Sequence, residues 1–201
     1  MHHHAGKGKA SSDNRSRRDQ SAAVRPPSGA ESPWVLLRSA TTHPLIYKRM
    51  LRTADPDARA GDVVNVYDKH GQRFGRGLYS PNSQIAVRML VHGDRLVDDD
   101  YWRSHLHRAV ALRERLRLSE MTDAYRLVHA EGDALSGLIV ERYADCLVFE
   151  VFSIGMYQRC ALFAGLLAEC LGPPHRLDHP NRSGEAWRVV IRHTGREQGT
   201  G

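Results

Sequence analysis

The stretch RFGRGLY, residues 73–79, combines residue types that contact nucleic acid. Its pattern predicts a β-strand in which both glycines, Gly75 and Gly77, lie on the same face as Tyr79, and Arg73 lies on that face too. A strand face without side chains allows an RNA backbone or base to lie against peptide groups, with tyrosine available for stacking and arginine for phosphate. Strand glycines also mark bulges and close packing, so a structural explanation competes with the RNA-facing one.

Two further arginines lie close to this face in the sequence. Arg76 falls on the opposite face of the same strand, and Arg88 stands between Ala86 and Leu90 in an otherwise apolar strand. An arginine among apolar residues is either part of a structural ion pair or a ligand contact, because such a charge is rarely buried alone. The sequence leaves both explanations open for Arg88.

A basic helix is predicted after three consecutive acids, Asp98, Asp99 and Asp100. Apolar residues from Trp102 to Leu116 recur at helical spacing, and acids are favourable at a helix N-terminus because it is partly positive. The basic residues of this helix are Arg103, His105, His107, Arg108, Arg113, Arg115 and Arg117. They could flank nucleic acid, but they are spread around the helix and form no single stripe, which favours a solvated face.

The histidines do not indicate a metal site. His105 and His107 are two residues apart and point to different sides of a helix, while His175 and His179 lie between prolines. No third ligand stands nearby with zinc spacing. We therefore predict no metal-binding residue.

The cysteines lack the signature of a nucleophile. Cys146, Cys160 and Cys170 are an odd number without C-x-x-C spacing, which is typical of core residues in a reducing cytoplasm. The sequence Gly75-Arg76-Gly77 lacks the third glycine and the following helix of the dinucleotide fingerprint. We therefore predict no catalytic residue and no cofactor-binding residue.

The overall charge favours an anionic partner. The 201 residues include 29 Lys and Arg against 23 Asp and Glu, a formal net charge of +6. Such an excess is compatible with nucleic acid without proving it. No run of about 18 apolar residues is present, so neither a membrane-spanning segment nor a membrane partner is expected.

The periodicity divides the chain into successive units of an α+β protein. Short strand-like runs separated by turn signals come first, and Gly71 closes a hairpin loop that begins at Asp68. After the long helix, three strands and a second helix ending at Gly172 form a smaller unit. The expected units are a disordered basic tail at 1–32, a small β-barrel at 33–97, a connecting helix at 98–118, a strand-strand-strand-helix α/β unit at 119–174 and an irregular tail at 175–201 with one possible strand, AWRVVIR.

Three long segments carry a family resemblance. They are ARAGDVVNVYDKHGQRFGRGLYSPNSQIAVRML, the helix YWRSHLHRAVALRERLRL, and DAYRLVHAEGDALSGLIVERYADCLVFEVFSIGMYQR. In this order they resemble the N-terminal half of the PUA-containing, SAM-dependent methyltransferases that make 5-methylcytosine in large-subunit ribosomal RNA. The resemblance covers roughly residues 34–171, and the motif G-x-Y-[SN]-P-x-S-Q-I followed by Y-R-L-[VI]-x-[GA]-E-x-D-x-L-x-G-L is specific.

The resemblance implies a PUA-like barrel that binds RNA, followed by a small linking domain. In the family a third, Rossmann-like domain binds S-adenosylmethionine and transfers the methyl group. We expect no Rossmann domain in this chain, so the cofactor is expected only for the full-length family and the partner is RNA, with large-subunit rRNA favoured. The RNA contacts predicted with the family in view are Lys48, Arg49, Arg73, Gly75, Arg76, Gly77, Tyr79 and Arg88.

The chain departs from the family pattern at several positions. Leu45 stands where the family usually has Trp, Ala134 and Ser136 stand where Gly and Pro are usual, and the sequence after Pro174 does not resemble the family's continuation. The linking domain is therefore expected to be cut short, and whether the chain is an enzyme stays open. A stand-alone RNA-binding adaptor, working with a separate methyltransferase domain or the ribosome, and a nonfunctional fragment are the alternatives.

Overall fold

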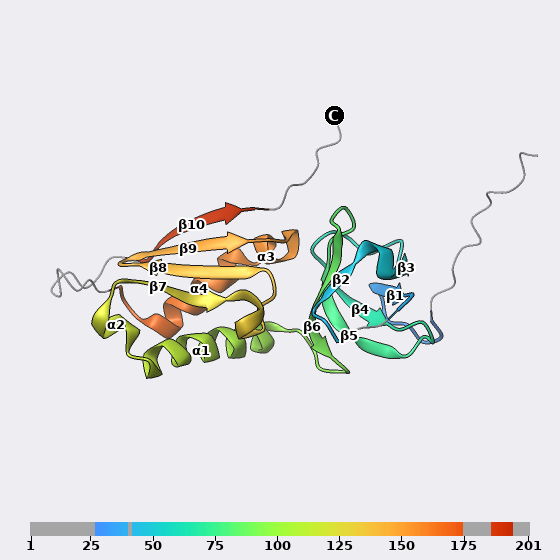
Figure 1. The fold of residues 1–201 in the computed structure, drawn as a ribbon, viewed down its shortest axis with the longest axis horizontal. Coiled ribbons are helices and arrows are strands. Elements are labelled where there is room, and N and C mark those ends of the chain that lie inside the picture. The colour runs from blue at the N-terminus through green and yellow to red at the C-terminus, as the bar shows by residue number, and fades with distance from the viewer. Residues whose placement is uncertain (1–26, 40–41, 175–185, 195–201) are drawn as a thin grey trace, which may run out of the picture.

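The computed structural model describes residues 27–39, 42–174 and 186–194. These residues form two β-sheets at opposite ends of an elongated molecule, joined by the segment 93–98 (Figure 1). The helices lie mainly with the second sheet. The expected mixed α/β fold is confirmed.

The first sheet is curled and has six strands in the order β2-β6-β5-β4-β1-β3. Its elements are β1 (Trp34–Leu37), β2 (Leu45–Tyr47), the 3-10 helix η1 (Lys48–Met50), β3 (Leu51–Ala54), β4 (Val63–Tyr67), β5 (Arg73–Tyr79) and β6 (Ile85–His92). The pair β1–β4 is parallel and the other pairs are antiparallel. Buried β-branched side chains such as Val35, Val64 and Val87 fill the interior of the curl, because alternation sends every second residue inward.

The hairpin between β4 and β5 closes as the sequence predicts. Gly71 adopts a positive φ of 79°, which costs a glycine little. The Asp68 carboxylate accepts hydrogen bonds from the backbone N–H groups of His70 and Gln72, each at 2.9 Å. The loop therefore fixes the register of the two strands.

Of the tail expected at 1–32, residues 1–26 lie outside the described residues. Residues that follow are attached to the first sheet: the backbone N–H of Glu31 donates to the Tyr67 hydroxyl at 3.1 Å, and the Ser32 hydroxyl donates to Asp55 at 2.7 Å. Glu31 and Ser32 therefore belong structurally to the first sheet.

Helix α1 (Asp99–Arg115) begins where the acids predict. The Asp98 side chain accepts a hydrogen bond from the backbone N–H of Tyr101 at 2.9 Å, which caps the helix. Its buried side, which includes Trp102 and Leu106, faces the second sheet. A short helix, α2 (Leu118–Met121), follows after Arg117, whose φ is +54°.

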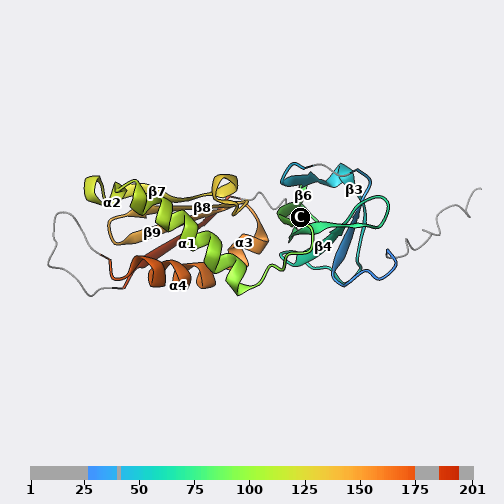
Figure 2. The same cartoon turned by 90° about the horizontal axis from the view of Figure 1, so that it is seen from below.

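The second sheet has the strand order β10-β9-β8-β7. Its elements are β7 (Ala124–His129), the 3-10 helix η2 (Ala130–Asp133), β8 (Leu138–Tyr143), β9 (Cys146–Val151), α3 (Ile154–Gln158), α4 (Cys160–Leu171) and β10 (Arg188–His193). Helices α1 and α4 cover one face of this sheet (Figures 1 and 2). Phe149, Phe163 and Leu106 belong to the core between the two layers.

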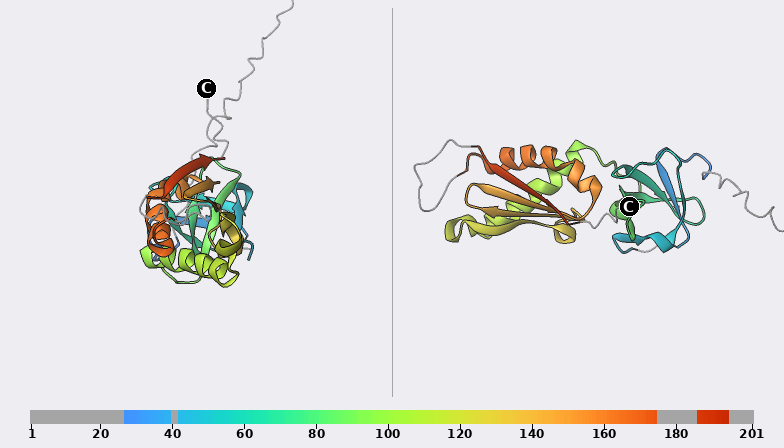
Figure 3. Two further views of the ribbon diagram at one scale, coloured as in Figure 1. Left: turned by 90° about the vertical axis from the view of Figure 1, so that its left-hand side faces the viewer. Right: turned by 90° about the horizontal axis from the view of Figure 1, so that it is seen from above.

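Strand β10 differs from the expected irregular tail at 175–201. Residues 188–193 pair in parallel with β9 over six residues, so the possible strand in AWRVVIR is formed and completes the sheet. β10 lies at the sheet edge (Figure 3), and Val189, Val190 and Ile191 are each more than 40% exposed. Backbone pairing holds this strand, because little of its apolar surface is buried.

The first sheet packs against the second unit through a small contact at α3. Leu78 of β5 is fully buried and belongs to the core of the second unit. A Cβ atom at Gly155 of α3 would lie 2.8 Å from the Leu78 side chain. Glycine is therefore needed at this point, where the first sheet meets α3.

Among the described residues, the helices are too short or too polar to cross a membrane.

Candidate nucleic-acid interface

A groove on the first sheet brings Tyr79 beside two basic side chains. Its lining includes Lys48 from η1, Arg52 from β3, Tyr79 from β5 and Pro81 from the turn that follows β5. Lys48 and Arg52 are exposed and form no ion pair within the described parts of the chain. Burial raises the pKa of the Tyr79 hydroxyl, so the ring is neutral near pH 7. The groove thus combines an aromatic face with uncompensated positive charge.

Arg49 extends this positive surface. Its guanidinium lies 5.5 Å from the centre of the Tyr47 ring, within the range of a cation–π contact. The sequence prediction named Lys48 and Arg49 but missed Arg52. The sequence YKRMLR does place Arg52 three residues after Arg49. In the structure η1 turns the chain between the two arginines, and both side chains stay on the surface.

Arg73 lies at the other end of β5, where acidic and polar groups hold it. Its guanidinium forms an ion pair with Glu31 at 2.9 Å and donates to Asn65 at 3.2 Å and to the Tyr67 hydroxyl at 3.3 Å. The hydrogen bond that Arg73 donates and the positive charge of Arg73 both lower the pKa of the Glu31 carboxyl group. The contacts of Arg73 therefore anchor the segment before β1 to the sheet.

Arg76 is almost completely buried, with 8% of its surface exposed. One guanidinium nitrogen donates to the backbone carbonyls of Asp94 and Arg95, at 2.7 and 2.6 Å. These bonds fix the start of the segment that connects the two sheets. Direct contact of Arg76 with RNA stays a prediction, and its present partners already give the side chain a structural role.

Gly75 and Gly77 lie where β5 approaches β6 very closely. A Cβ atom at Gly75 would lie 2.1 Å from the carbonyl oxygen of Val91, and one at Gly77 would lie 2.6 Å from that of Arg88. The neighbouring strand therefore occupies the space beside both glycines. This packing accounts for the two glycines without a ligand, and their contact with RNA is untested.

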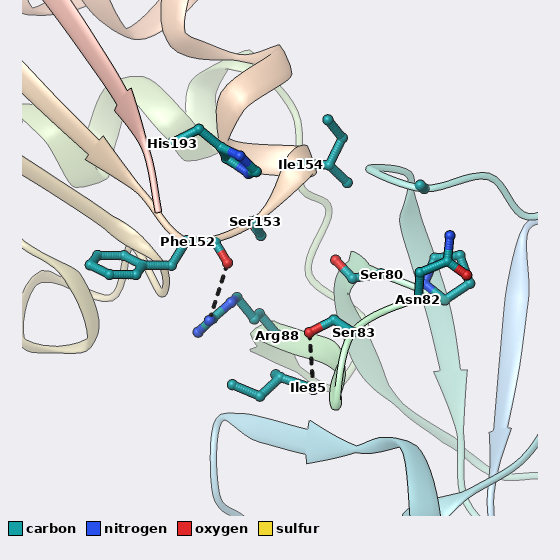
Figure 4. Close-up of a pocket in the computed structure, with 11 residues that line it drawn as sticks. Ser80, Asn82, Ser83, Ile85, Arg88, Phe152, Ser153, Ile154 and His193 are labelled. Carbon is teal, nitrogen blue, oxygen red and sulfur yellow. Dashed lines mark hydrogen bonds between the residues drawn. The ribbon is translucent and has the colours of Figure 1, made fainter. Parts of the chain in front are cut away.

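Arg88 lies at the junction of the two sheets and makes only long contacts. It donates to the carbonyl oxygen of Phe152 at 3.4 Å (Figure 4) and lies 3.7 Å from the Glu131 carboxylate. Its side chain is 11% exposed. Burial lowers the pKa of Arg88, and the charge of Glu131 opposes this shift. Arg88 is thus a buried cation with weak partners.

Beside Arg88 is a pocket formed by both units (Figure 4). The turn at 80–83 lines one side, and Ser153, Ile154 and His193 line the other. The second side lies just beyond the carboxyl ends of β9 and β10, a place where open α/β sheets commonly bind ligands. Polar and apolar side chains both line the pocket, and none of the described residues that line it carries a carboxylate.

This pocket does not fit S-adenosylmethionine. The cofactor is usually held by a glycine-rich turn from a strand into a helix and by an acid that binds the ribose hydroxyls. Here β9 leads into α3 through Phe152 and Ser153, and no acid faces the pocket. We therefore derive no methyl-transfer step from it.

The pocket and the Tyr79 groove share the turn at 80–83. Pro81 of this turn lines both hollows. Of the eight predicted contacts, Lys48, Arg49 and Tyr79 lie at or near the groove, and Arg88 lies at the pocket. Arg73, Gly75, Arg76 and Gly77 have structural partners along β5, and nothing brings them to the same surface.

Part of the first sheet matches a known domain family. Residues 38–92 match the PUA-like domain family. Over these residues, which leave out β1, the first sheet is similar to a PUA-like domain. The resemblance expected from the sequence is thereby confirmed for this part of the chain.

Relatives of the chain are RNA-modifying enzymes by name. It is 34% identical over 129 residues to Ribosomal RNA large subunit methyltransferase I of Aliivibrio fischeri strain MJ11, covering 64% of this chain and 33% of the relative. It is 36% identical over 114 residues to the protein of the same name from Alteromonas mediterranea, covering 56% and 29%. The chain thus spans about a third of the length of these curated relatives.

Solved structures share the fold of the described part. A protein from Streptococcus mutans described as a SAM-dependent methyltransferase matches with a TM-score of 0.53 at 19% identity, covering 63% of this chain and 33% of that one. A structure described as a methyltransferase complexed with SAH matches with the same score and identity. At this identity the likeness concerns the fold alone.

Proposed function

We propose that this chain is the RNA-docking portion of a SAM-dependent rRNA methyltransferase and that large-subunit rRNA is its partner. The names of the relatives support the class of partner. The observation that carries the proposal is the Tyr79 groove of the PUA-like domain, in which unpaired Lys48 and Arg52 flank an aromatic ring. A cytoplasmic location follows from this proposal.

The groove suits a single RNA strand. Lys48 and Arg52 neutralise phosphates, and Arg49 extends the basic edge. The neutral ring of Tyr79 stacks on a base, a contact worth about 1–3 kcal/mol per base. Such contacts position RNA and perform no chemistry on it.

In this proposal the chain contains a PUA-like domain at 33–97, a connecting helix at 98–118 and a linking domain at 119–174 whose sheet is completed by β10, and these parts carry no methyl-transferring site. The state of two cysteines supports this. Burial raises the pKa of Cys160 to about 11 and also raises that of Cys170. Both thiols are therefore protonated near neutral pH, whereas a nucleophilic cysteine must be a thiolate.

The test of RNA docking uses the double variant K48E/R52E with single-stranded segments of large-subunit rRNA. We expect its affinity to fall at least tenfold and its salt dependence to weaken, because about two phosphate contacts are lost. The matched control, R59E/K69E, changes the same charge at exposed positions elsewhere on the PUA-like domain. Equal affinities of the two variants would refute the proposed groove.

Calorimetry with S-adenosylmethionine tests the second part of the proposal. We expect no heat of binding from this chain, because the described pockets do not provide the groups that hold the cofactor. Measurable binding, or methyl transfer to rRNA by this chain unaided, would overturn it.

A further inference from the structure

The arginines of α1 differ in whether a carboxylate neutralises them. Arg103 pairs with Glu169, and Arg113 pairs with Asp133. In the described part of the chain, Arg108 and Arg115 form no ion pair. Among the described residues, α1 thus carries two exposed arginines whose positive charge no carboxylate neutralises. The sequence of the helix alone does not distinguish them from the paired arginines.

These two arginines lie on one side of the helix. They are seven residues apart, which is about two turns or 10 Å. Both border a groove between α1 and η2, and His105 and Gly132 line it as well. Figure 2 shows α1 running across the outer side of the second unit. The two charges are therefore presented together on an accessible surface.

The acid in this groove does not cancel them. Asp133 receives two hydrogen bonds from Arg113, at 2.8 and 2.9 Å, and its carboxylate is 9% exposed. The charge of Asp133 is therefore balanced within the pair. The groove keeps a positive potential from Arg108 and Arg115.

His105 forms an uncharged wall of the groove. It is 4% exposed, and its Nδ1 lies 2.7 Å from the carbonyl oxygen of Tyr101. Burial lowers its pKa, and the nearby charges of Arg108 and Arg95 lower it further. The cationic character of the groove near neutral pH thus comes from arginine.

Arg95, in the segment between the two sheets, adds a third charge near His105. Its guanidinium lies 5.6 Å from the centre of the Tyr101 ring, which lies 4.1 Å from that of His105. Arg95 forms no ion pair among the described residues. The buried Arg76 holds its backbone carbonyl at 2.6 Å. Arg95 is therefore positioned between the PUA-like domain and α1.

We propose that Arg95, Arg108 and Arg115 form a second phosphate-binding site, which holds the backbone of the RNA that docks on the PUA-like domain. This inference rests on the proposed function. Guanidinium groups bind phosphates by bidentate hydrogen bonds. RNA fits better than an acidic protein segment, because the charges lie at separate points along α1 and the segment before it. Among the described residues that line the groove, Leu112 is the one large apolar side chain, whereas protein interfaces usually require a cluster of apolar anchors.

The experiment compares two double variants with the same change in charge, one within α1 and one that combines an α1 residue with Arg117, just before α2. R108E/R115E reverses the unpaired arginines, and R103E/R117E reverses two exposed arginines that pair with Glu169 and Glu120. Each is titrated with a long single-stranded rRNA segment and with an oligonucleotide of about six nucleotides, near the lower end of site sizes for a stacking surface. Circular dichroism and thermal unfolding confirm that the variants are folded.

We expect R108E/R115E to weaken binding of the long RNA about tenfold and to lower the slope of log K against log salt by about 1.4, from about 0.7 for each phosphate on a single strand. Binding of the short oligonucleotide should stay nearly unchanged. R103E/R117E should change both affinities much less. The variant R108K/R115K, which keeps the charges, should retain most of the affinity for long RNA.

The outcomes separate this inference from the proposed function. If K48E/R52E abolishes binding while R108E/R115E matches its control, the groove on the PUA-like domain stands and the α1 site is refuted. If neither variant differs from its control, both are refuted. If R108E/R115E instead loses an acidic protein partner and keeps its RNA affinity, the site exists but the assignment to RNA is wrong.

Discussion

Arg113 of α1 and Asp133 of η2 are joined by two parallel hydrogen bonds of 2.8 and 2.9 Å. Both side chains are about 10% exposed. Asp133 also accepts a hydrogen bond of 2.6 Å from the backbone N–H of His129. The pair therefore ties the long helix to the turn between β7 and β8, beside the proposed phosphate site.

Replacing Arg113 by methionine should destabilise the protein by about 3 kcal/mol, because the Asp133 charge is left buried without its partner. Urea unfolding followed by circular dichroism measures the loss. The double variant R113M/D133N should recover part of it, since no unpaired charge remains. A double variant no more stable than R113M would contradict this explanation.

The same pair makes stability depend on pH. Burial tends to raise the pKa of Asp133, but the hydrogen bonds from Arg113 and His129 and the charge of Arg113 outweigh it and lower the pKa. A lowered folded-state pKa gives stability that is present above the unfolded value, about 3.9, and is lost as pH falls through the folded value. The stability difference between wild type and R113M should therefore narrow below about pH 4. A difference that stays constant down to pH 2 would show that the Asp133 charge is not responsible.

Two glycine-to-alanine variants should shift stability in opposite directions. At Gly77 an added Cβ would lie 2.6 Å from both the Arg88 carbonyl oxygen and a Val87 methyl group, so G77A should cost at least about 2 kcal/mol. At Gly165 in α4 nothing lies within 4 Å, and alanine is the better helix former by about 1 kcal/mol. Thermal unfolding should thus show a lower Tm for G77A and a higher one for G165A. An unchanged Tm for G77A would mean that β5 and β6 are less close than described.

Replacing Arg88 should lower the stability of the protein less than replacing Arg113 does. Its contacts with Phe152 and Glu131 are 3.4 and 3.7 Å long, so they repay little of the cost of burying the charge. We expect R88M to change the free energy of unfolding by no more than about 1 kcal/mol. A folded R88M with reduced affinity for rRNA would support the predicted RNA contact of Arg88. A loss of stability as large as that of R113M would instead mark Arg88 as an essential link between the units.

Much of the local structure could be predicted because its causes are local. The cap at Asp98 and the positive φ at Gly71 depend on neighbours within a few residues, and the sequence shows both. The parallel pairs β1–β4 and β9–β10 were not predictable in this way. They join segments that lie far apart in the chain, and periodicity does not report which strands become neighbours.

The candidate site shows the same limit. Lys48, Arg49 and Tyr79 could be named from their residue types on or beside predicted strands, whereas Arg52 was missed. The arginines of α1 could not be sorted from the sequence, because the acid that neutralises Arg103 is 66 residues away and the one that neutralises Arg113 is 20 residues away. Only the fold determines which cations keep their charge available.

Pro81 in the turn at 80–83 lines both the Tyr79 groove and the pocket beside Arg88. Because one proline belongs to both linings, a substitution at this residue would alter the shape of each hollow and could not serve as a test of either one separately.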